Sequence, residues 1–410
     1  MASLPSDRVL ARVAAQRDAM IKLQRLLTAT PAIGPENGGG GEWDKAQALV
    51  AWLAQLGLPE PVDLSAVDAR VPAGKRPNLL VTCPGSSPER LWIIAHLDVV
   101  PPGDEAEWSS PPFKLVEDGE FLVGRGVEDN QQSLVASLFA LRSLLDEGVV
   151  PARTVKLLFV SDEETGSAFG MQYLLGNYDL FHPDDLVLVP DGGGPDGSLI
   201  EVAEKSLLWL KIHTRGRQGH ASFPGSGINA FVAGSHLVGR LAELERELSR
   251  HNPLFDPSHS TFTPTKKEAN VPNVNTIPGE DVFYVDARIL PDEDVDAVLG
   301  LVRGRCREIE QRFGVSVEVT IQVHDPSPPT RLDTPLIPRL ARAIERVYGV
   351  RGVPRGIGSS TVAAFLRRAR LDTVVWSRVE GAAHFPNERC RISNMIGDSQ
   401  VMALLMMGGS

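Results

Sequence analysis

The stretch from Val155 to Gly170 reads V-K-L-L-F-V-S-D-E-E-T-G-S-A-F-G. Its apolar, β-branched half ends at Val160, and acidic residues follow almost at once, at Asp162, Glu163 and Glu164. This pattern predicts a buried strand that delivers carboxylates to the edge of a sheet. Neighbouring side chains on extended backbone point to opposite sides, so Glu163 and Glu164 are expected to have different tasks, one on a metal and the other facing a reacting water. A solvated acidic turn is the alternative for this stretch taken alone.

Three other predicted strands end in residues that bind metals in proteins. They are Leu91–Ala95 before His96, Leu186–Val189 before Asp191, and Thr373–Trp376 before the loop that holds His384. Segments with helical periodicity separate the strands, at Ala11–Leu27, Lys45–Leu56, Ser133–Leu145 and Leu336–Tyr348. Alternating strands and helices predict an α/β catalytic domain with a mainly parallel sheet and helices on both faces. Ligands of such sheets bind beyond the carboxyl ends of the strands, so the four strand ends are expected to form one site.

A different order of elements lies between Ser206 and Val323. The expected elements are the strand Leu207–Thr214, the helix Asn229–Arg250, the strands Asn270–Asn275 and Val282–Leu290, the helix Val295–Phe313 and the strand Val315–Val323. This β-α-β-β-α-β order is that of the ferredoxin-like unit. We therefore expect a catalytic domain in two parts, 1–206 and 325–410, with a ferredoxin-like lid or dimerisation domain inserted at 207–324.

Composition narrows the class of protein further. A chain of 410 residues is longer than one hydrophobic core usually serves, which agrees with two domains. The net charge of −11 argues against nucleic acid and anionic membranes as partners. Cys83, Cys306 and Cys390 lie far apart and form no CxxC motif, which favours a reducing compartment over disulfides. No stretch has the character of a signal peptide or a membrane span, so a cytoplasmic location is expected.

The segment His96-Leu97-Asp98 has the form of a metal ligand with a supporting carboxylate. Alternation along a strand places His96 and Asp98 on one face, where Asp98 can accept a hydrogen bond from the ring nitrogen that does not bind metal. A structural histidine is the alternative for a lone His at a strand end, and the nearby Asp98 favours metal binding. Imidazoles and carboxylates without thiolates suit zinc, cobalt or manganese in a catalytic site.

The chain also resembles a known family in its motifs. These are H-L-D-V-V-P-P-G-D from His96, G-R-G-V-E-D-N from Gly124, S-D-E-E-T-G from Ser161, G-R-Q-G-H-A-S-F-P from Gly216, N-T-I-P-G from Asn275 with D-A-R from Asp286, and H-F-P-N-E from His384. They are similar, in order and spacing over nearly the whole chain, to the metal-dependent amidohydrolases that include acetylornithine deacetylase, succinyl-diaminopimelate desuccinylase and carboxypeptidase G.

The resemblance implies two divalent metal ions, zinc first and cobalt or manganese as alternatives. His96 and Asp191 would hold one ion, Glu164 and His384 the other, and Asp129 would bridge them. Three carboxylates against two divalent cations leave a charge of +1, which one bridging hydroxide cancels. A site with a single metal ion is a closely related alternative.

The resemblance gives Glu163 the role of general base, which passes the proton of the attacking water to the leaving amine. It also implies a cis peptide between Asp129 and Asn130. The intact Glu163 argues against a protein that binds its ligand without hydrolysing it.

Further residues of the inserted domain are implied to bind substrate. His220 would stabilise the oxyanion, often from the partner subunit of a homodimer formed through this domain. Arg288 would grip a substrate carboxylate, although Asp286 two residues earlier leaves a structural ion pair open. Asn275 and the backbone at Gly358 are weaker candidates for substrate binding.

Two stretches depart from the family pattern. Gly358–Ala364 lacks the Asp and Arg that many relatives carry there, which weakens a role as a desuccinylase. Asn130-Gln131-Gln132 replaces the more usual Met-Lys-Gly beside the site.

The function expected from these observations is hydrolysis of the amide of an N-acyl amino acid or a dipeptide with a free carboxylate. Succinyl-diaminopimelate desuccinylase or acetylornithine deacetylase proper is the nearer alternative. A ligand-binding protein that kept the metals and lost the chemistry is the more distant one. The expected partner in each case is a small molecule.

Overall fold

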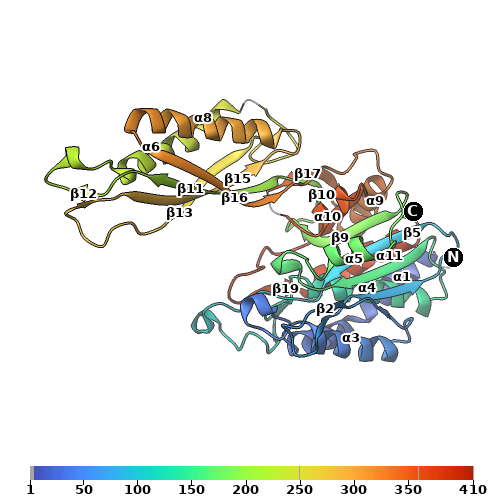
Figure 1. The fold of residues 1–410 in the computed structure, drawn as a ribbon. Coiled ribbons are helices and arrows are strands. Elements are labelled where there is room, and N and C mark those ends of the chain that lie inside the picture. Colours follow the sequence, from blue (N-terminus) through green and yellow to red (C-terminus); the bar gives the residue numbers. More distant parts are fainter. Residues whose placement is uncertain (1–3, 249, 359, 410) are drawn as a thin grey trace. The chain divides into compact units, whose positions relative to one another are not determined.

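The structure is a computed structural model that describes residues 4–248, 250–358 and 360–409. The chain forms two compact units (Figure 1). Unit 1 comprises Met1–Val202, Thr330–Arg355 and Thr361–Ser410, and unit 2 comprises Ala203–Pro329 with Gly356–Ser360. The sequence analysis assigned 356–360 to the catalytic domain, whereas this segment lies with unit 2. The action of the inserted segment as a lid or dimerisation domain stays a prediction.

The largest sheet has eight strands. Their spatial order is β1 (Val62–Asp63), β4 (Leu79–Cys83), β8 (Thr154–Val160), β5 (Arg90–His96), β9 (Leu186–Gly193), β18 (Thr373–Ser377), β10 (Leu199–Glu204) and β17 (Val353–Ile357). The four neighbours β8, β5, β9 and β18 are parallel. Antiparallel strands flank them, because β4 pairs with β1 and β8, and β10 pairs with β18. The expected α/β fold is confirmed, and the antiparallel flanks are an addition to it.

Helices cover both faces of this sheet, as strand β5 demonstrates. Ile93 belongs to a core shared with one set of helices: α1 (Pro5–Ala15), α2 (Arg17–Thr28), α3 (Trp43–Gln55), α4 (Gln131–Asp146), α9 (Leu336–Tyr348) and α11 (Ile392–Met406). Its neighbours Trp92 and Ile94 belong to a second core with α5 (Met171–Asn177) and α10 (Ala363–Arg368). A strand buried on both faces needs apolar residues at every position, which explains the unbroken apolar runs in the sequence.

Unit 2 contains a four-stranded antiparallel sheet with helices on one face (Figure 1). The chain order is β11 (Ser206–Arg215), α6 (Ala230–Ala242), β13 (Thr261–Lys267), β15 (Glu280–Ile289), α8 (Val295–Phe313) and β16 (Ser316–Asp325). The spatial order is β13-β15-β11-β16, which is the expected ferredoxin-like arrangement. Short elements accompany it: β12 (Gly219–His220), η4 (Pro224–Ser226), α7 (Leu244–Glu247) and β14 (Thr276–Ile277).

Two sequence-based boundaries in unit 2 are wrong. The expected strand Asn270–Asn275 is a loop, and the second strand of the unit is β13 instead. Strand β13 lies at the sheet edge and carries Pro264 at a register shift, the kind of position at which a strand tolerates proline. The expected helix Asn229–Arg250 ends at Ala242, and the short helix α7 follows it.

The remaining elements are small. They are β2 (Ala66–Val67), β3 (Lys75–Arg76), β6 (Val116–Asp118), β7 (Phe121–Val123), β19 (Arg389–Arg391) and the 3-10 helices η1 (Pro35–Asn37), η2 (Glu105–Glu107) and η3 (Glu163–Thr165). Cys83, Cys306 and Cys390 are buried free thiols. Among the described residues, we find no helix with both the length and the apolar character needed to cross a bilayer.

Candidate metal centre

The carboxyl ends of the four parallel strands lie side by side at one edge of the large sheet. His96 is the last residue of β5, Glu163 and Glu164 begin η3 directly after β8, and Asp191 lies in β9. His384 lies in the segment that follows β18. Parallel neighbours end at the same edge, so residues distant in sequence become neighbours there.

The five residues expected to bind metal form one connected cluster. His96 Nε2 lies 2.8 Å from Asp129 Oδ1 and 3.5 Å from Asp191 Oδ1. His384 Nε2 lies 3.1 Å from Asp129 Oδ2 and 3.1 Å from Glu164 Oε2. The carboxylate of Asp129 therefore stands between the two imidazoles, which is the position a bridging ligand requires. The peptide that joins Asp129 to the next residue is cis.

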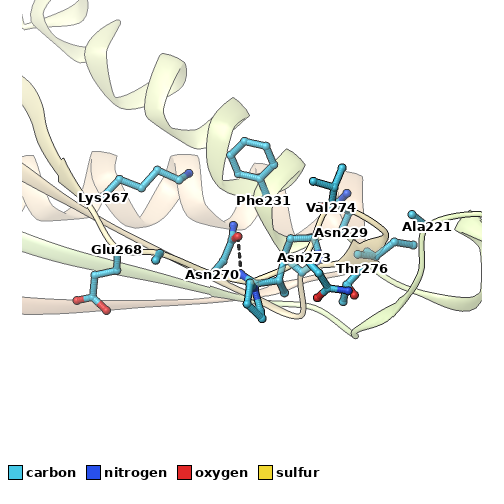
Figure 2. A pocket seen from close by; sticks show the side chains of 14 residues that line it. Ala221, Asn229, Phe231, Lys267, Glu268, Asn270, Asn273, Val274 and Thr276 are labelled. Carbon is cyan, nitrogen blue, oxygen red and sulfur yellow. Dashed lines mark hydrogen bonds between the residues drawn. The ribbon is translucent and has the colours of Figure 1, made fainter.

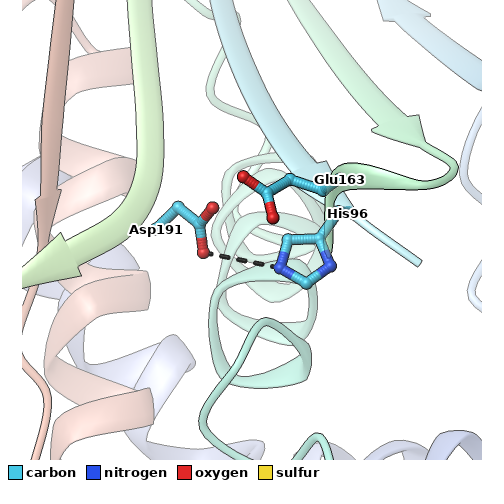
Figure 3. A group of neighbouring side chains, drawn as sticks. All are labelled: His96, Glu163 and Asp191. Atoms are coloured by element: carbon cyan, nitrogen blue, oxygen red, sulfur yellow. Dashed lines mark ion pairs between the residues drawn. The ribbon is translucent and has the colours of Figure 1, made fainter. Parts of the chain in front are cut away.

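Two groups of three side chains place their possible ligand atoms within 4.8 Å of one another. One is His96, Glu163 and Asp191, and the other is His96, Asp129 and Glu164. Figure 3 shows the first group, with Glu163 and Asp191 both directed toward the imidazole of His96. The first group contains Glu163, the expected general base. The geometry alone thus leaves Glu163 two possible tasks, as a ligand or as a base.

Asp98 supports the centre differently from the expectation. The Nδ1 atom of His96 lies 3.0 Å from the backbone oxygen of Asp98, and the nearer carboxylate oxygen is 3.4 Å away. The Asp98 carboxylate accepts hydrogen bonds from the backbone N–H groups of Glu163 and Glu164, both at 3.1 Å. Asp98 therefore holds the turn that carries both glutamates.

The nearby Lys45 is 1% exposed, and burial lowers its pKa to about 8 although the charge of Asp98 opposes this change.

The buried carboxylate of Glu388 holds the segment that carries Asp129, and the sequence analysis did not identify it. It accepts hydrogen bonds from the backbone N–H groups of Gly126 at 2.9 Å, Glu128 at 2.9 Å and Asp129 at 3.0 Å. It also pairs with Arg125 Nη1 at 2.8 Å, and both side chains are 1% exposed. Glu388 is the last residue of the motif H-F-P-N-E, so this motif could have identified it from the sequence.

A second buried carboxylate, that of Glu128, was missed in the same way. It accepts hydrogen bonds from the backbone N–H groups of Glu380 at 2.7 Å, Ala382 at 2.7 Å and Ala383 at 3.2 Å. These residues come directly before His384, whose backbone has a φ of 68°. Glu128 therefore positions the loop that presents His384.

Burial and close contact between the titratable groups of the cluster shift the pKa values of Glu163, Glu164 and His384. Burial, reinforced by Asp191, raises the pKa of Glu163 well above its ordinary value. Burial and the charge of Asp129 raise the pKa of Glu164 to about 7. Hydrogen bonds to Asp129 and Glu164 raise the pKa of His384 to about 10. Carboxylates this close repel one another when ionised, and a divalent cation among them would relieve that repulsion.

Two of the expected substrate-binding residues of unit 2 contact each other. Arg288 donates from Nε and Nη2 to Asp286 at 2.7 and 3.0 Å, and from Nη1 to the carbonyl of Gly358 at 2.8 Å. The ion pair that the sequence analysis left open is therefore present. The Arg288 side chain is still 30% exposed. Ser359, which follows Gly358, lies outside the described residues.

The other two candidates, His220 and Asn275, lie together at the opposite end of β15. His220 pairs with Thr276 across β12 and β14, and the backbone N–H of Ala221 donates to the carbonyl of Asn275 at 2.9 Å. Glu280 at the start of β15 and Arg288 near its end are eight residues apart, or about 27 Å along a strand. Within unit 2, the two pairs are therefore too far apart to bind one amino acid together.

A cavity of about 520 Å³ lies beside this second pair. Figure 2 shows that Ala221 and Thr276, the neighbours of His220 and Asn275, line it together with Phe231 and Asn270. The cavity contains none of the acidic cluster, which belongs to unit 1.

Residues 92–408 match the model of the family described as Peptidase family M20/M25/M40. An uncharacterized metallohydrolase of Methanococcus maripaludis is 35% identical over 407 aligned residues, which cover 94% of this chain and 97% of that protein. A succinyl-diaminopimelate desuccinylase of Maricaulis maris is 28% identical over 306 residues, 74% of each chain.

Solved structures show the same fold. The di-peptidase Dug1p of Saccharomyces cerevisiae is similar with a TM-score of 0.75 at 16% identity over 98% of both chains. The aminopeptidase PepT of Bacillus cereus is similar with a TM-score of 0.76 at 16% identity, over 96% of this chain and 99% of that one. The family model spans all five clustered residues from His96 to His384, and we conclude that the chain belongs to the peptidase family M20/M25/M40.

Proposed function

We propose that this protein is a dinuclear metal-dependent hydrolase that cleaves the amide of an N-acyl amino acid or a dipeptide with a free carboxylate. The observation that carries the proposal is the convergence of His96, Asp129, Glu164, Asp191 and His384 at one sheet edge, with Glu163 among them. Two imidazoles and three carboxylates, without a thiolate, are ligands that suit zinc, cobalt or manganese. We propose zinc first.

The proposed ligand arrangement follows the contacts. Asp129 reaches both imidazoles and would bridge the ions, with His96 and Asp191 on one side and Glu164 and His384 on the other. Such ions, when bound, act as Lewis acids that polarise the scissile carbonyl and lower the pKa of water.

Glu163 would do the proton chemistry. Its carboxylate takes a proton from the attacking water and delivers it to the nitrogen of the leaving amine. Asp98 positions Glu163 through the backbone N–H of that residue and does not itself need to contact the substrate.

Arg288 would bind the free carboxylate of the leaving amino acid. Its guanidinium is oriented by Asp286 and by the carbonyl of Gly358, and its side chain is 30% exposed. A planar guanidinium with a fixed orientation is well suited to a carboxylate.

We also propose that the protein works as a homodimer in which His220 acts on the active site of the partner subunit. The separation of about 27 Å along β15 supports this assignment, since His220 and Arg288 of one unit cannot serve the same small substrate. The cytoplasmic location expected from the sequence stays a prediction.

The test is hydrolysis of N-acetyl amino acids and dipeptides by protein loaded with zinc, cobalt or manganese. We expect turnover with metal, none after chelation, and a loss of about 10²- to 10⁴-fold in kcat for Glu163→Gln. The metal content of Glu163→Gln should equal that of the wild type if Glu163 is the base, whereas Glu164→Gln should lose metal. The exposed Glu117 provides a control, Glu117→Gln, that should change neither quantity.

Two results would overturn the proposal. One is the absence of turnover across the panel by the metal-loaded protein, which would favour a binding protein of the same fold. The other is undiminished turnover by Glu163→Gln.

Desuccinylation is a second candidate, because relatives such as that of Maricaulis maris bear that name. The run from Gly358 to Ala364 lacks the Asp and Arg of the family pattern, which argues against a site for a succinyl carboxylate. Adding succinyl-diaminopimelate and acetylornithine to the same panel separates the candidates.

A further inference from the structure

A cavity on the sheet of unit 2 has not yet been given a task. Its volume is about 440 Å³, and Trp209, Lys266, Tyr284, Asp286 and Gln322 are among its lining residues. Pockets for small ligands have volumes of about 300 to 1,000 Å³ and are lined mainly by apolar and aromatic side chains with a few placed polar groups. The cavity therefore has the size and the lining of a ligand site.

The cavity lies on the face of the sheet that points away from helices α6 and α8. Leu208 and Leu210, the neighbours of Trp209 in β11, are buried in the core that these helices share with the sheet. Successive side chains on a strand point to opposite faces, so Trp209 lies on the other face. Its side chain is large and apolar, and it is 42% exposed.

A single carboxylate orients both Trp209 and Arg288. The indole Nε1 of Trp209 donates a hydrogen bond to Asp286 Oδ2 at 3.0 Å. The Nη2 atom of Arg288 donates to the same oxygen, also at 3.0 Å, and its Nε donates to Asp286 Oδ1 at 2.7 Å. The indole and the guanidinium are therefore neighbours with fixed orientations, at the same end of the cavity.

The cavity continues from Arg288 along β15. Asp286 and Tyr284 come two and four residues before Arg288, which places them on the same face at about 7 and 14 Å along the strand. Arg288 uses three of its five N–H groups on Asp286 and Gly358, and the other two have no acceptor among the described residues. A carboxylate on these two groups would leave the rest of its molecule beside Trp209.

The chemistry of the cavity favours a flat, apolar group. Trp209 and Tyr284 offer aromatic surface, and aromatic rings attract one another beyond the burial of their area. The charge of Asp286 is already met by Arg288. The Nζ atom of Lys266 lies 4.7 Å from the centroid of the Tyr284 ring, in a cation–π contact. An anionic group in the cavity would meet the opposing charges of Lys266 and Asp286.

We propose that this cavity binds the side chain of the leaving amino acid, and that Trp209 makes the enzyme prefer substrates in which that amino acid is aromatic. The inference rests on the proposed function, because it takes Arg288 to hold the carboxylate of the leaving amino acid. Trp209 belongs to none of the motifs that the sequence analysis identified.

Four substrates that differ only in one side chain test the proposal. They are the N-acetyl derivatives of phenylalanine, leucine, alanine and glutamate. We expect the wild type to prefer the phenylalanine derivative over the alanine derivative in kcat/KM by about tenfold to a hundredfold, the range for burying a large apolar side chain. The leucine derivative should lie between these two, and the glutamate derivative should lie below the phenylalanine derivative.

The substitution Trp209→Ala should bring the ratio of phenylalanine to alanine substrates close to unity, whatever it does to the overall rate through Arg288. Trp209→Phe keeps a ring and loses the N–H that Asp286 accepts, so it should keep most of the preference. The matched control is Tyr178→Ala, which removes a 38% exposed aromatic ring from unit 1 and should match the wild type in both rate and ratio.

Calorimetry gives a readout that does not depend on turnover. Metal-loaded Glu163→Gln should bind N-acetyl-phenylalanine more tightly than N-acetyl-alanine. The difference in affinity should disappear when Trp209→Ala is combined with Glu163→Gln.

The outcomes separate the two proposals. If the alanine or glutamate derivative is cleaved as well as the phenylalanine derivative, or if Trp209→Ala leaves the ratio unchanged, the role of Trp209 is wrong and the proposed function stands. If the metal-loaded wild type cleaves none of these compounds or of the wider panel, the proposed function falls. Calorimetry then decides on the cavity, and equal affinities for the phenylalanine and alanine derivatives refute its role as well.

Discussion

Replacing Asp98 by asparagine is the sharpest test of how the turn of Glu163 and Glu164 is held. The Asp98 carboxylate is 2% exposed and accepts two backbone N–H groups at 3.1 Å, one from each glutamate. The amide of asparagine has the same shape but only one acceptor oxygen, so one of the two N–H groups would face an NH₂ group instead. Water cannot easily replace the lost acceptor, because the site is buried.

The size of the effect follows from the hydrogen bond that is lost. A hydrogen bond to a charged group contributes about 1.5 to 3 kcal/mol, which corresponds to about 10- to 150-fold in an equilibrium or rate constant. Residues that orient metal ligands typically change metal affinity or activity by about 10- to 100-fold when mutated, which is the same range. We therefore expect Asp98→Asn to lose about 10- to 100-fold in metal affinity or in kcat/KM at saturating metal.

The assay is competition for zinc between the protein and a chelating dye, followed by kcat/KM measurements in excess metal. Asp63→Asn is the matched control, because Asp63 also accepts a backbone N–H, that of Ser65 at 3.0 Å, but lies exposed on the edge strand β1. The control should match the wild type. If Asp98→Asn stays within about threefold of the wild type in both quantities, the positioning role assigned to Asp98 is wrong.

Three further predictions concern residues away from this turn. Glu388→Gln leaves the buried Arg125 without its counter-ion. It should therefore lower the free energy of unfolding of the metal-free protein, measured by urea denaturation, by about 3 to 5 kcal/mol. A decrease below about 1 kcal/mol would contradict the role given to Glu388. Mixing inactive His220→Ala with inactive Glu163→Gln should restore up to about a quarter of the wild-type activity. If His220 acts across the dimer, each mixed dimer has one complete site. No recovery would place His220 in the site of its own subunit. Burial raises the pKa of Asp398 to about 6, so the folded state holds the proton of the Asp398 carboxyl group more tightly than the unfolded state does. The resulting stabilisation of the folded state is present below about pH 4 and is lost as the pH rises through 6. The metal-free wild type should therefore lose about 2 kcal/mol relative to Asp398→Asn between pH 4 and pH 7, and parallel stability profiles would refute this.

Much of the fold follows from local patterns in the sequence. Helices α8 and α9 begin and end at the expected residues, Val295–Phe313 and Leu336–Tyr348, because their apolar periodicity is regular and their C-terminal glycines adopt a left-handed φ. The strand at 261–267 escaped detection because Pro264 and its lysines hide an edge strand, and the apolar residues of 270–275 belong to a loop. Edge strands have weak patterns, since only part of their surface is buried.

The candidate site divides in the same way. The residue types that suit a metal, and their places at strand ends, are properties of the sequence, because apolar runs predict the strands and parallel strands end at one edge. The hydrogen-bond partners of the supporting carboxylates cannot be read from the sequence. Asp98, Glu128 and Glu388 all accept hydrogen bonds from backbone N–H groups. Almost every residue carries the same backbone N–H, so no letter in the sequence indicates which one a distant carboxylate will meet.

The sequence by itself determined the chemistry available to this protein: an α/β sheet edge with two imidazoles, several carboxylates and an arginine on a second, ferredoxin-like unit. Only the tertiary structure decided which carboxylate holds the amides of Glu163 and Glu164, that Glu163 lies within reach of His96 and Asp191, and that Asp286 joins Trp209 to Arg288. The physical reason is that side-chain identity is local, whereas the pairing of donors and acceptors depends on where the whole chain brings them.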